Sequence, residues 1–512
     1  MTPHAVKYPA QALLIAALAW IPTGAALGDE PQEFSRSKQI AHWMGRVHFS
    51  GGVLPAVEMR GEYPELIAEP LETRVDKRAR KPVRVNRDLL DMEATQQPGY
   101  QAEPYIHANP FDPTHLIAGW QENRFMDGGA QALNVAVSFD AGKNWTESIL
   151  PGLTQVNGGP WEAASDPWVE FGPNNRVYFS SLLFNKTTPD NVIAISSSAD
   201  GGLTWGDPVE VFRSFFDFND KEAVTVDTFP GSPYFGRVYV AWDINLTDST
   251  GQNFISQRLV VARSRTNGSF RKPKRIRNGA TNIGAVPRVG PGGTVYVIWS
   301  GNPAGDSSGP RLLVYFSRST NGGRRWSRPK AIAELMPAGV ATIRGGSILP
   351  SFAIDPTNGD LYVAWSDGRW TGTDKSTLIF SRDGGATWSA PRNASGAPAN
   401  APTFTTTVAV NGRSEVAVGY YSLENDPSLA NLVDRYVVIS DDGGETFGEA
   451  IRATRRTFDI RLAALAGASF FLGDYVGLTG SDRRFHLLWV GTKRKSATLE
   501  RRQPDVFTAM TR

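Results

Sequence analysis

The stretch SRDGGATW (residues 381–388) recurs along the chain in close variants, called here the repeated word. Near-copies are SFDAGKNW (138–145), SADGGLTW (198–205), STNGGRRW (319–326) and SDDGGETF (440–447). The Asp383 carboxylate can accept hydrogen bonds from backbone N–H groups of its own turn. Gly384 and Gly385 allow the positive φ angles of a tight hairpin, and Trp388 can pack on the sheet that follows. The word is therefore expected to hold a hairpin together and to carry no chemistry.

Each repeated word lies within a longer unit of about 60 residues. An apolar run precedes it (TLIFS, 377–381), and an earlier run ends in an aromatic residue (LYVAW, 361–365). A third run comes earlier still (PSFAID, 350–355), and a short run with proline follows the word (SAPRNA, 389–394). Short runs rich in β-branched and aromatic residues, bounded by Gly, Pro, Asn and Asp, are typical of strands. Four strands in each repeating unit predict the blades of a β-propeller.

The last unit lacks one strand, because PDVFTAMTR (504–512) matches the third strand and the sequence then stops. An open last blade would leave an unpaired edge, so a strand before residue 103, such as VRV (83–85), is expected to complete it. The predicted fold is all-β, a seven-bladed propeller of four-stranded blades whose ring is closed by an N-terminal strand. Six blades remain the alternative if the final unit packs differently.

The first 28 residues have the character of a targeting segment. Lys7 precedes an apolar run (10–21), and small residues follow up to Gly28. This pattern predicts a secretory signal peptide, with an uncleaved anchor as the alternative, and a secreted or periplasmic monomer. Residues 29–92 are predicted to be an irregular extension that contains the closing strand, and residues 93–512 to be the propeller.

The composition excludes several classes of function. The chain has 53 basic and 51 acidic residues, interspersed, which gives no argument for a nucleic-acid partner. It has no cysteine, so disulfides and thiolate chemistry are excluded. No internal stretch is apolar enough to span a membrane. The histidines of the propeller (His107, His115 and His486) lack metal-ligand spacing, so we expect no metal or other cofactor.

Charged side chains are expected where the first strand of each unit enters the channel. They are Glu103, Asp166, Asp220, Lys221, Glu222, Arg288, Arg344 and Asp474, with Tyr475 beside them. One interpretation is a solvated ring of mutually neutralising charges. The other is a site for a glycan or another anionic small ligand, at the channel mouth on the face away from the repeated words. The aromatic residues that end the second strands, such as Trp365, are expected to pack between blades, or else to stack on sugars.

The repeated word resembles the Asp-box, or BNR repeat, S-x-D-x-G-x-x-W, of the sialidase-like propellers, here of the secreted bacterial type. The resemblance covers residues 93–512. Sialidases hold the substrate carboxylate with three arginines and use a tyrosine nucleophile paired with a glutamate, and an aspartate as acid/base. The resemblance implies catalytic roles for Tyr475, Glu222 and Asp166. It implies substrate binding by the arginines and the remaining rim residues, which are Arg288, Arg344, Arg369, Glu103, Asp220, Lys221 and Asp474.

One segment departs from the family pattern. Glu103, in AEPYIHANP (102–110), stands near the position where sialidases have their first arginine. Three functions follow. The first is a sialidase-like glycoside hydrolase acting on acidic glycans. The second is a non-catalytic propeller that binds a glycan or a protein. The third is a polysaccharide lyase, in which Tyr475 is the base and Arg288 or Lys221 neutralises a uronate carboxylate.

Overall fold

The computed structural model describes residues 78–84, 99–125, 127–247, 254–266, 268–277, 281–303, 311–494 and 502–511. Within these ranges the protein is all-β, and many of its sheets are antiparallel and four-stranded, which is consistent with a β-propeller. The first two units join into one eight-stranded sheet, where Ala130 pairs with Ala164. Short 3₁₀ turns interrupt the strands; they are η2 (Gln155–Asn157), η3 (Pro291–Gly293) and η4 (Ile460–Leu462). No helix in the described part of the chain is long and apolar enough to cross a membrane.

The first four units each give four strands in chain order. The first comprises β2 (Ala102–Asn109), β3 (Asp112–Arg124), β4 (Ala130–Ser138) and β5 (Thr146–Ile149). The second comprises β6 (Ala163–Phe171), β7 (Val177–Phe184), β8 (Asn191–Ser198) and β9 (Val209–Ser214). The third comprises β10 (Phe218–Val226), β11 (Val238–Thr247), β12 (Phe254–Arg263) and β13 (Lys274–Ile276). The fourth comprises β14 (Thr281–Val289), β15 (Val295–Asn302), β16 (Leu312–Ser319) and β17 (Lys330–Leu335).

The later units carry small additions. The fifth comprises β19 (Ser351–Ile354), β20 (Leu361–Asp367), β21 (Lys375–Ser381) and β22 (Arg392–Asn393). The sixth comprises β23 (Thr403–Val410), β24 (Val416–Ser422), β25 (Leu432–Ser440) and β26 (Ile451–Arg452), with β27 (Phe458–Asp459) also on β25. The seventh comprises β30 (Gly477–Gly480), β31 (Phe485–Arg494), β32 (Arg502–Met510) and β1 (Val83–Arg84). A separate small sheet joins β18 (Ile343–Arg344), β28 (Ala464–Ala466) and β29 (Ser469–Phe471).

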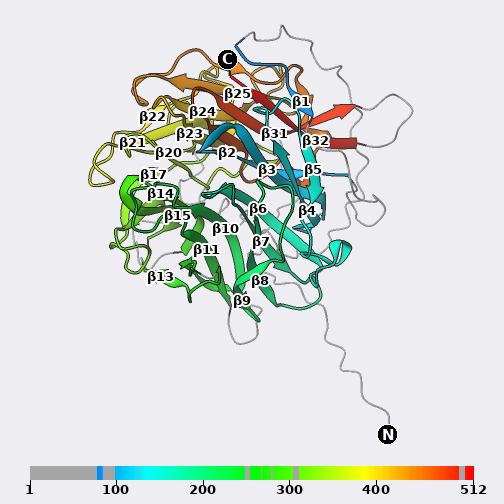
Figure 1. Cartoon of the computed structure of the whole chain (residues 1–512). Helices are drawn as coiled ribbons and strands as arrows, with labels where there is room; N and C mark the ends of the chain where they lie inside the picture. The colour runs from blue at the N-terminus through cyan, green and yellow to red at the C-terminus, as the bar shows by residue number, and fades with distance from the viewer. Residues whose placement is uncertain are drawn as a thin grey trace.

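The first strands of the sheets contact one another in turn. β2 packs against β6, β6 against β10, β10 against β14, β14 against β19, β19 against β23, β23 against β30, and β30 against β2. Figure 1 shows β2, β6 and β10 near the middle of the molecule, and β9 and β13 at its edge. The strands that open each unit therefore lie innermost, where the sequence expects a channel.

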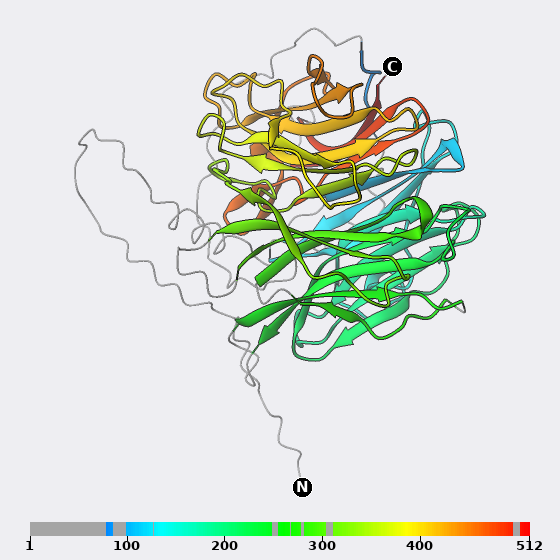
Figure 2. The same ribbon diagram turned by 90° about the vertical axis from the view of Figure 1, so that its left-hand side faces the viewer.

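The strand at Val83–Arg84 lies beside the last strand of the chain. It pairs antiparallel with β32, with Val83 opposite Thr508, and so completes the sheet that β30, β31 and β32 begin. Figure 2 shows this segment, in blue, beside the C-terminal end of the chain. The predicted signal peptide and most of the predicted extension lie outside the described residues.

The repeated word holds its hairpin by the predicted hydrogen bonds. The Asp383 carboxylate accepts the backbone N–H of Thr387 at 2.8 Å and the Ser381 hydroxyl at 2.8 Å. Gly384 and Gly385 have φ angles of +66° and +88°. The same side-chain-to-backbone bond is 2.9 Å long in each of the four other copies. Each repeated word is therefore a turn in which the Asp or Asn side chain accepts hydrogen bonds from backbone N–H groups.

The repeated word also docks each sheet onto the sheet before it. The Gly384 carbonyl accepts Arg318 Nη1 at 2.7 Å, and the Gly443 carbonyl accepts Arg382 Nη2 at 2.7 Å. A Cβ on Gly385 would lie 2.2 Å from Phe316 Cζ of the preceding sheet. The second glycine is thus required by close packing as well as by its φ angle.

The aromatic residues that end the second strands are core residues. Trp120, Trp242, Trp299 and Trp365 are 0% exposed, and Trp489 is 2% exposed. The indole N–H of Trp242 donates to Asn219 Oδ1 at 2.8 Å, and that of Trp299 donates to Asn282 Oδ1 at 2.7 Å. Their burial confirms the packing interpretation and leaves no surface for stacking on sugars.

Candidate functional site

A β-bulge recurs near the start of the first strands. The strand register shifts between Ala102 and Tyr105 in β2, between Ser165 and Trp168 in β6, and between Asp220 and Ala223 in β10. The first bulged residue has a positive φ, a position that glycine usually occupies: Glu103 (54°), Asp166 (52°), Lys221 (53°), Gly284 (71°) and Thr405 (49°). Positive φ is strained for residues other than glycine, and such strain concentrates at functional sites. Three of these strained residues carry a charge.

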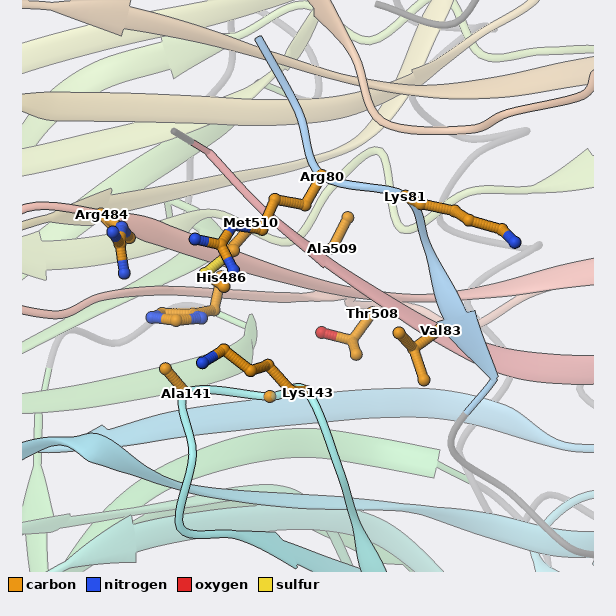
Figure 3. A pocket seen from close by; sticks show the side chains of 11 residues that line it. Arg80, Lys81, Val83, Ala141, Lys143, Arg484, His486, Thr508, Ala509 and Met510 are labelled. Carbon is orange, nitrogen blue, oxygen red and sulfur yellow. The ribbon is translucent and has the colours of Figure 1, made fainter. Parts of the chain in front are cut away.

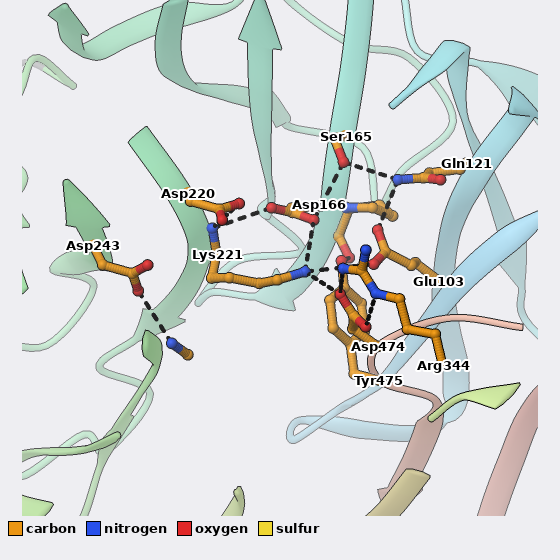
Figure 4. Close-up of polar contacts among 12 residues, drawn as sticks. Glu103, Gln121, Ser165, Asp166, Asp220, Lys221, Asp243, Arg344, Asp474 and Tyr475 are labelled. Atoms are coloured by element: carbon orange, nitrogen blue, oxygen red, sulfur yellow. Dashed lines mark hydrogen bonds and ion pairs between the residues drawn. The ribbon is translucent and has the colours of Figure 1, made fainter. Parts of the chain in front are cut away.

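Two of the charged bulge residues, Glu103 and Asp166, lie around the ammonium group of the third, Lys221 (Figure 4). Lys221 Nζ lies 2.5 Å from Asp474 Oδ2, 3.7 Å from Glu103 Oε1 and 3.7 Å from Asp166 Oδ1. All four side chains are at most 4% exposed. Arg344 adds a second cation, since its Nε donates to Asp474 Oδ1 at 2.8 Å and its Nη2 donates to Asp474 Oδ2. We call these five residues the charge cluster.

Two loops bring Arg344 and Asp474 together. β18 runs parallel to β29 with Arg344 opposite Phe471, which places Asp474 just beyond the same small sheet. A Cβ on Gly346 would lie only 2.0 Å from the Asp474 carbonyl oxygen, and Gly346 has a φ of +61°. A glycine is therefore needed for the loops to approach.

The carboxyl groups of the site are of two kinds, those with a raised pKa and one with a lowered pKa. Burial raises the pKa of Glu103 to about 8, against the attraction of Lys221. Burial and the nearby Asp166 hold the pKa of Glu222 well above its usual range. Burial also acts on Asp474, but Arg344 and Lys221 outweigh it and lower its pKa. Carboxyl groups that keep a proton thus lie beside one that stays ionised at neutral pH.

Glu222 and Tyr475 belong to the same site. Glu222 is 2% exposed, and neither of its carboxylate oxygens accepts a hydrogen bond from another described residue. The Tyr475 hydroxyl donates to the Pro167 carbonyl at 3.4 Å. Burial, then the nearby carboxylates of Glu103, Asp166, Glu222 and Asp474, raise the pKa of Tyr475 well above 10. The phenol therefore keeps its proton unless a neighbouring base removes it.

Sequence reasoning missed three buried residues of this site, which are Gln121, Arg124 and Asp243. Gln121 donates from Nε2 to Glu103 at 2.7 Å and to Ser165 at 2.9 Å, and its Oε1 accepts Arg124 Nη1 at 2.5 Å. Asp243 accepts the Gly284 N–H at 3.1 Å, and burial followed by Asp220 raises its pKa. Gln121 and Asp243 directly follow Trp120 and Trp242, so the residue after the repeated tryptophan is the signal that could have found them.

Aromatic rings lie next to the charge cluster, two residues further along the first strands. Tyr105 stacks on Trp168 with ring centroids 3.9 Å apart. Tyr475 meets both rings edge-on, at 6.5 Å from Tyr105 and 5.4 Å from Trp168. These three rings separate the charge cluster from the next polar layer.

Arg288 lies in that next layer, where it lines a cavity that Glu222, Arg344 and Tyr475 do not line. That the four side chains share one pocket stays a prediction. It stands four residues after the bulge of β14, as His107 and Glu170 do in β2 and β6. Its Nη1 donates to Glu170 Oε1 at 3.3 Å, and its Nη2 donates to the Tyr105 hydroxyl at 2.9 Å. The sequence showed the strand but not the register along it.

The second layer opens into a cavity of about 560 Å³ near the turns that end the first strands. His107, Glu170, Thr225, Arg288 and Ala409, each four residues after a bulge, line it. Burial raises the pKa of Glu170 to about 7, and burial followed by Arg288 lowers the pKa of His107 to about 3. We call this region the cavity layer.

Arg369 joins neither layer, and its role as a third substrate arginine stays a prediction. Its Nε and Nη2 each lie 2.8 Å from the carboxylate of Asp367, two residues earlier. Asp367 also accepts the indole N–H of Trp365 at 2.6 Å. This local pairing holds Arg369 in the β20–β21 connection. The three predicted arginines therefore have three separate partners, which are Glu170, Asp474 and Asp367.

In the part of the chain that the structure describes, no group of three His, Cys, Asp or Glu residues is placed to hold a metal ion. Within the charge cluster, Lys221 and Arg344 supply the positive charge that the carboxylates face.

Comparisons with known proteins find similar folds at low identity. No protein-family model and no curated protein sequence matches the chain. Among solved structures, the α-L-arabinofuranosidase Arb93A from Fusarium graminearum is 15% identical with a TM-score of 0.45, over 70% of this chain and 98% of that one. The polysaccharide lyase Uly1 is 10% identical with a TM-score of 0.46, over 78% and 88%. A protein of unknown function from Dyadobacter fermentans is 13% identical with a TM-score of 0.43, over 85% and 100%. Likeness at this level carries no conclusion about activity.

Proposed function

We propose that this protein is a glycoside hydrolase whose acid/base groups lie at the charge cluster. The observation that supports it most is the split in protonation, with Glu222 and Glu103 kept protonated beside an ionised Asp474. Hydrolysis of a glycosidic bond commonly needs one carboxylic acid to protonate the leaving oxygen and one carboxylate on the other side of the sugar. Neighbouring carboxyls with opposed pKa shifts are the usual mark of that division of labour.

In this proposal Glu222 is the general acid. Its proton passes to the glycosidic oxygen as the bond to the anomeric carbon breaks, and the ionised Asp474 stabilises the positive charge that develops on the sugar. Asp166 serves as the base for the attacking water. Tyr475 as nucleophile is the alternative form of the same proposal, and it requires a neighbouring carboxylate, Asp166, to take the phenolic proton.

The charge balance favours a neutral glycan over an acidic one. Carboxyl groups outnumber cations at the site: six of them (Glu103, Asp166, Asp220, Glu222, Asp243 and Asp474) lie near Lys221, Arg124 and Arg344. Arg344, the predicted grip for a substrate carboxylate, already binds Asp474 with two donors. A ligand would approach from the side of Arg344, which is 13% exposed, and the half-buried Tyr475. We therefore revise the expected substrate from acidic to neutral.

A second candidate is a non-catalytic propeller that binds a glycan or a protein. It is favoured by the pairing of all three predicted arginines with carboxylates of the protein itself. A lyase is not proposed, because Lys221 lies among three carboxylates and cannot neutralise a uronate as well.

A panel of fluorogenic glycosides, neutral and sialic- or uronic-acid-bearing, tests the proposal. We expect turnover of a neutral member and a loss of about 10²–10⁴-fold in Glu222→Gln. Glu445→Gln is the matched control, since Glu445 is exposed and pairs with Arg392 away from the site. Turnover that survives in Glu222→Gln, or the absence of any turnover, would overturn the proposal. Binding on a glycan array without turnover would support the second candidate.

We propose further that the scaffold is a seven-bladed ring closed by β1. The support is the cycle of contacts among the seven innermost strands and the pairing of β1 with β32. The division into residues 1–28, 29–92 and 93–512, secretion through the signal peptide and a monomeric state are part of the same proposal. N-terminal sequencing and light scattering of the exported protein test them.

A further inference from the structure

A basic groove lies where the two ends of the described chain meet. Its volume is about 680 Å³, and it lies between the sheet completed by β1 and the first repeated word. Four cations line it, and no Asp or Glu does: they are Arg80, Lys81, Lys143 and Arg484. Three separate segments supply them, namely the approach to β1, the word at 138–145 and the β30–β31 turn.

Several surface cations of the protein pair with a carboxylate, whereas these four, among the described residues, do not. Arg213 pairs with Glu210, Arg382 with Asp360 and Arg392 with Glu445. Over the described ranges, none of the four groove cations forms an ion pair. Like charges that the fold brings together repel one another, and an anion between them would remove that repulsion.

The His486 side chain in the floor of the groove adds no charge to that of the four cations. His486 is 1% exposed, and burial, helped by Arg484, lowers its pKa to about 4, so the ring is neutral at physiological pH. Figure 3 shows Arg80, Lys143 and Arg484 reaching toward the His486 side of the groove, while Lys81 points away. Three cations thus face one space from three sides.

We propose that this groove binds a tetrahedral oxyanion, a sulfate or phosphate group, which ties the N-terminal segment to the first and last blades. Guanidinium groups present paired donors that match the oxygens of such an anion, and the Lys143 ammonium adds a point charge. This site lies outside the charge cluster and does not depend on the proposed hydrolysis.

The test is the thermal stability of the full chain in sodium sulfate or phosphate, against sodium chloride at equal ionic strength. A ligand that binds only the folded state raises the melting temperature in a concentration-dependent way. We expect the wild type to gain several degrees, and Lys143→Gln with Arg484→Gln to lose most of that gain and at least about 10-fold in calorimetric affinity. Lys272→Gln, an exposed lysine far along the chain, is the matched control and should behave as the wild type.

An equal gain in the wild type and in the double variant would show a general salt effect and overturn the proposal, as would no gain at all. If the double variant fails to fold, Lys143→Gln alone supplies the comparison, because Lys143 is an exposed position of the word. Dextran sulfate and dextran form the second arm. Tighter binding of dextran sulfate than of inorganic sulfate assigns the sulfate of a glycan, and the reverse order assigns the free ion.

Discussion

The first strands carry two polar layers, four residues apart, which differ in how their buried charges are balanced. In the charge cluster, strained bulge residues gather more carboxyl groups than cations in a region almost closed to solvent. In the cavity layer, one arginine meets one glutamate in regular strand geometry and opens into a cavity. Regular pairing is explained by stability alone. Strain combined with surplus charge is not, and it is what supports the proposal that the charge cluster is functional.

The largest expected effect is the loss of folding stability when the buried cation of the charge cluster, Lys221, is removed. Lys221→Met leaves the buried carboxyl groups of Glu103, Asp166 and Asp474 without their shared ammonium, so the free energy of unfolding should fall by about 3–5 kcal/mol. Denaturant unfolding measures it, with Lys272→Met as the exposed control. A cost below that of losing one neutral hydrogen bond would mean that the carboxylates are not held by Lys221.

The same experiment at Arg288 should give a smaller loss. Arg288→Met removes hydrogen bonds to Glu170 and Tyr105 beside a cavity that water can enter, so we expect about 1–3 kcal/mol. An equal or greater loss than in Lys221→Met would reverse the contrast between the layers.

The pH dependence of stability sharpens the comparison. Glu103 holds its proton up to a pKa of about 8 in the folded chain, against 4.5 when unfolded, so its contribution falls as the pH rises through that window. Glu103→Gln should flatten the decline in melting temperature between about pH 5 and 8. Glu170→Gln should flatten it only to about pH 7. An unchanged slope in Glu103→Gln would contradict the protonated state assigned to that carboxyl.

The smallest effect is expected away from both layers. Asp383→Ala removes the bonds from Thr387 and Ser381 in one repeated word, and the melting temperature should fall by about 1–3 °C. Hydrolysis should stay at the wild-type rate. A loss of turnover at full folded yield would give the word a role in chemistry.

The strands and the repeated words could be predicted because each rests on local pattern. Alternation, turn glycines and the Asp383 carboxylate act within a few residues. Lys221 lies near the start of one first strand, and Asp474 lies just before another. Their closeness could therefore be expected from the sequence.

Register along the strands could not be predicted. The bulges at Glu103, Asp166 and Lys221 put a non-glycine residue at a positive φ, which no propensity indicates. Arg288 therefore looked equivalent to Lys221, although Gly284 holds that position. The partners of Arg344 and Arg369 depend on loops whose paths the sequence does not show.

The most direct test of the account compares two glutamates, one beside the bulge and one in the cavity layer. The measurement is kcat/KM on the best glycoside of the panel for Glu222→Gln and Glu170→Gln, with folding checked by circular dichroism. We expect a loss of at least about 100-fold for Glu222→Gln and of less than about 3-fold for Glu170→Gln. Full activity in Glu222→Gln with a collapse in Glu170→Gln would contradict it and move the chemistry to the cavity.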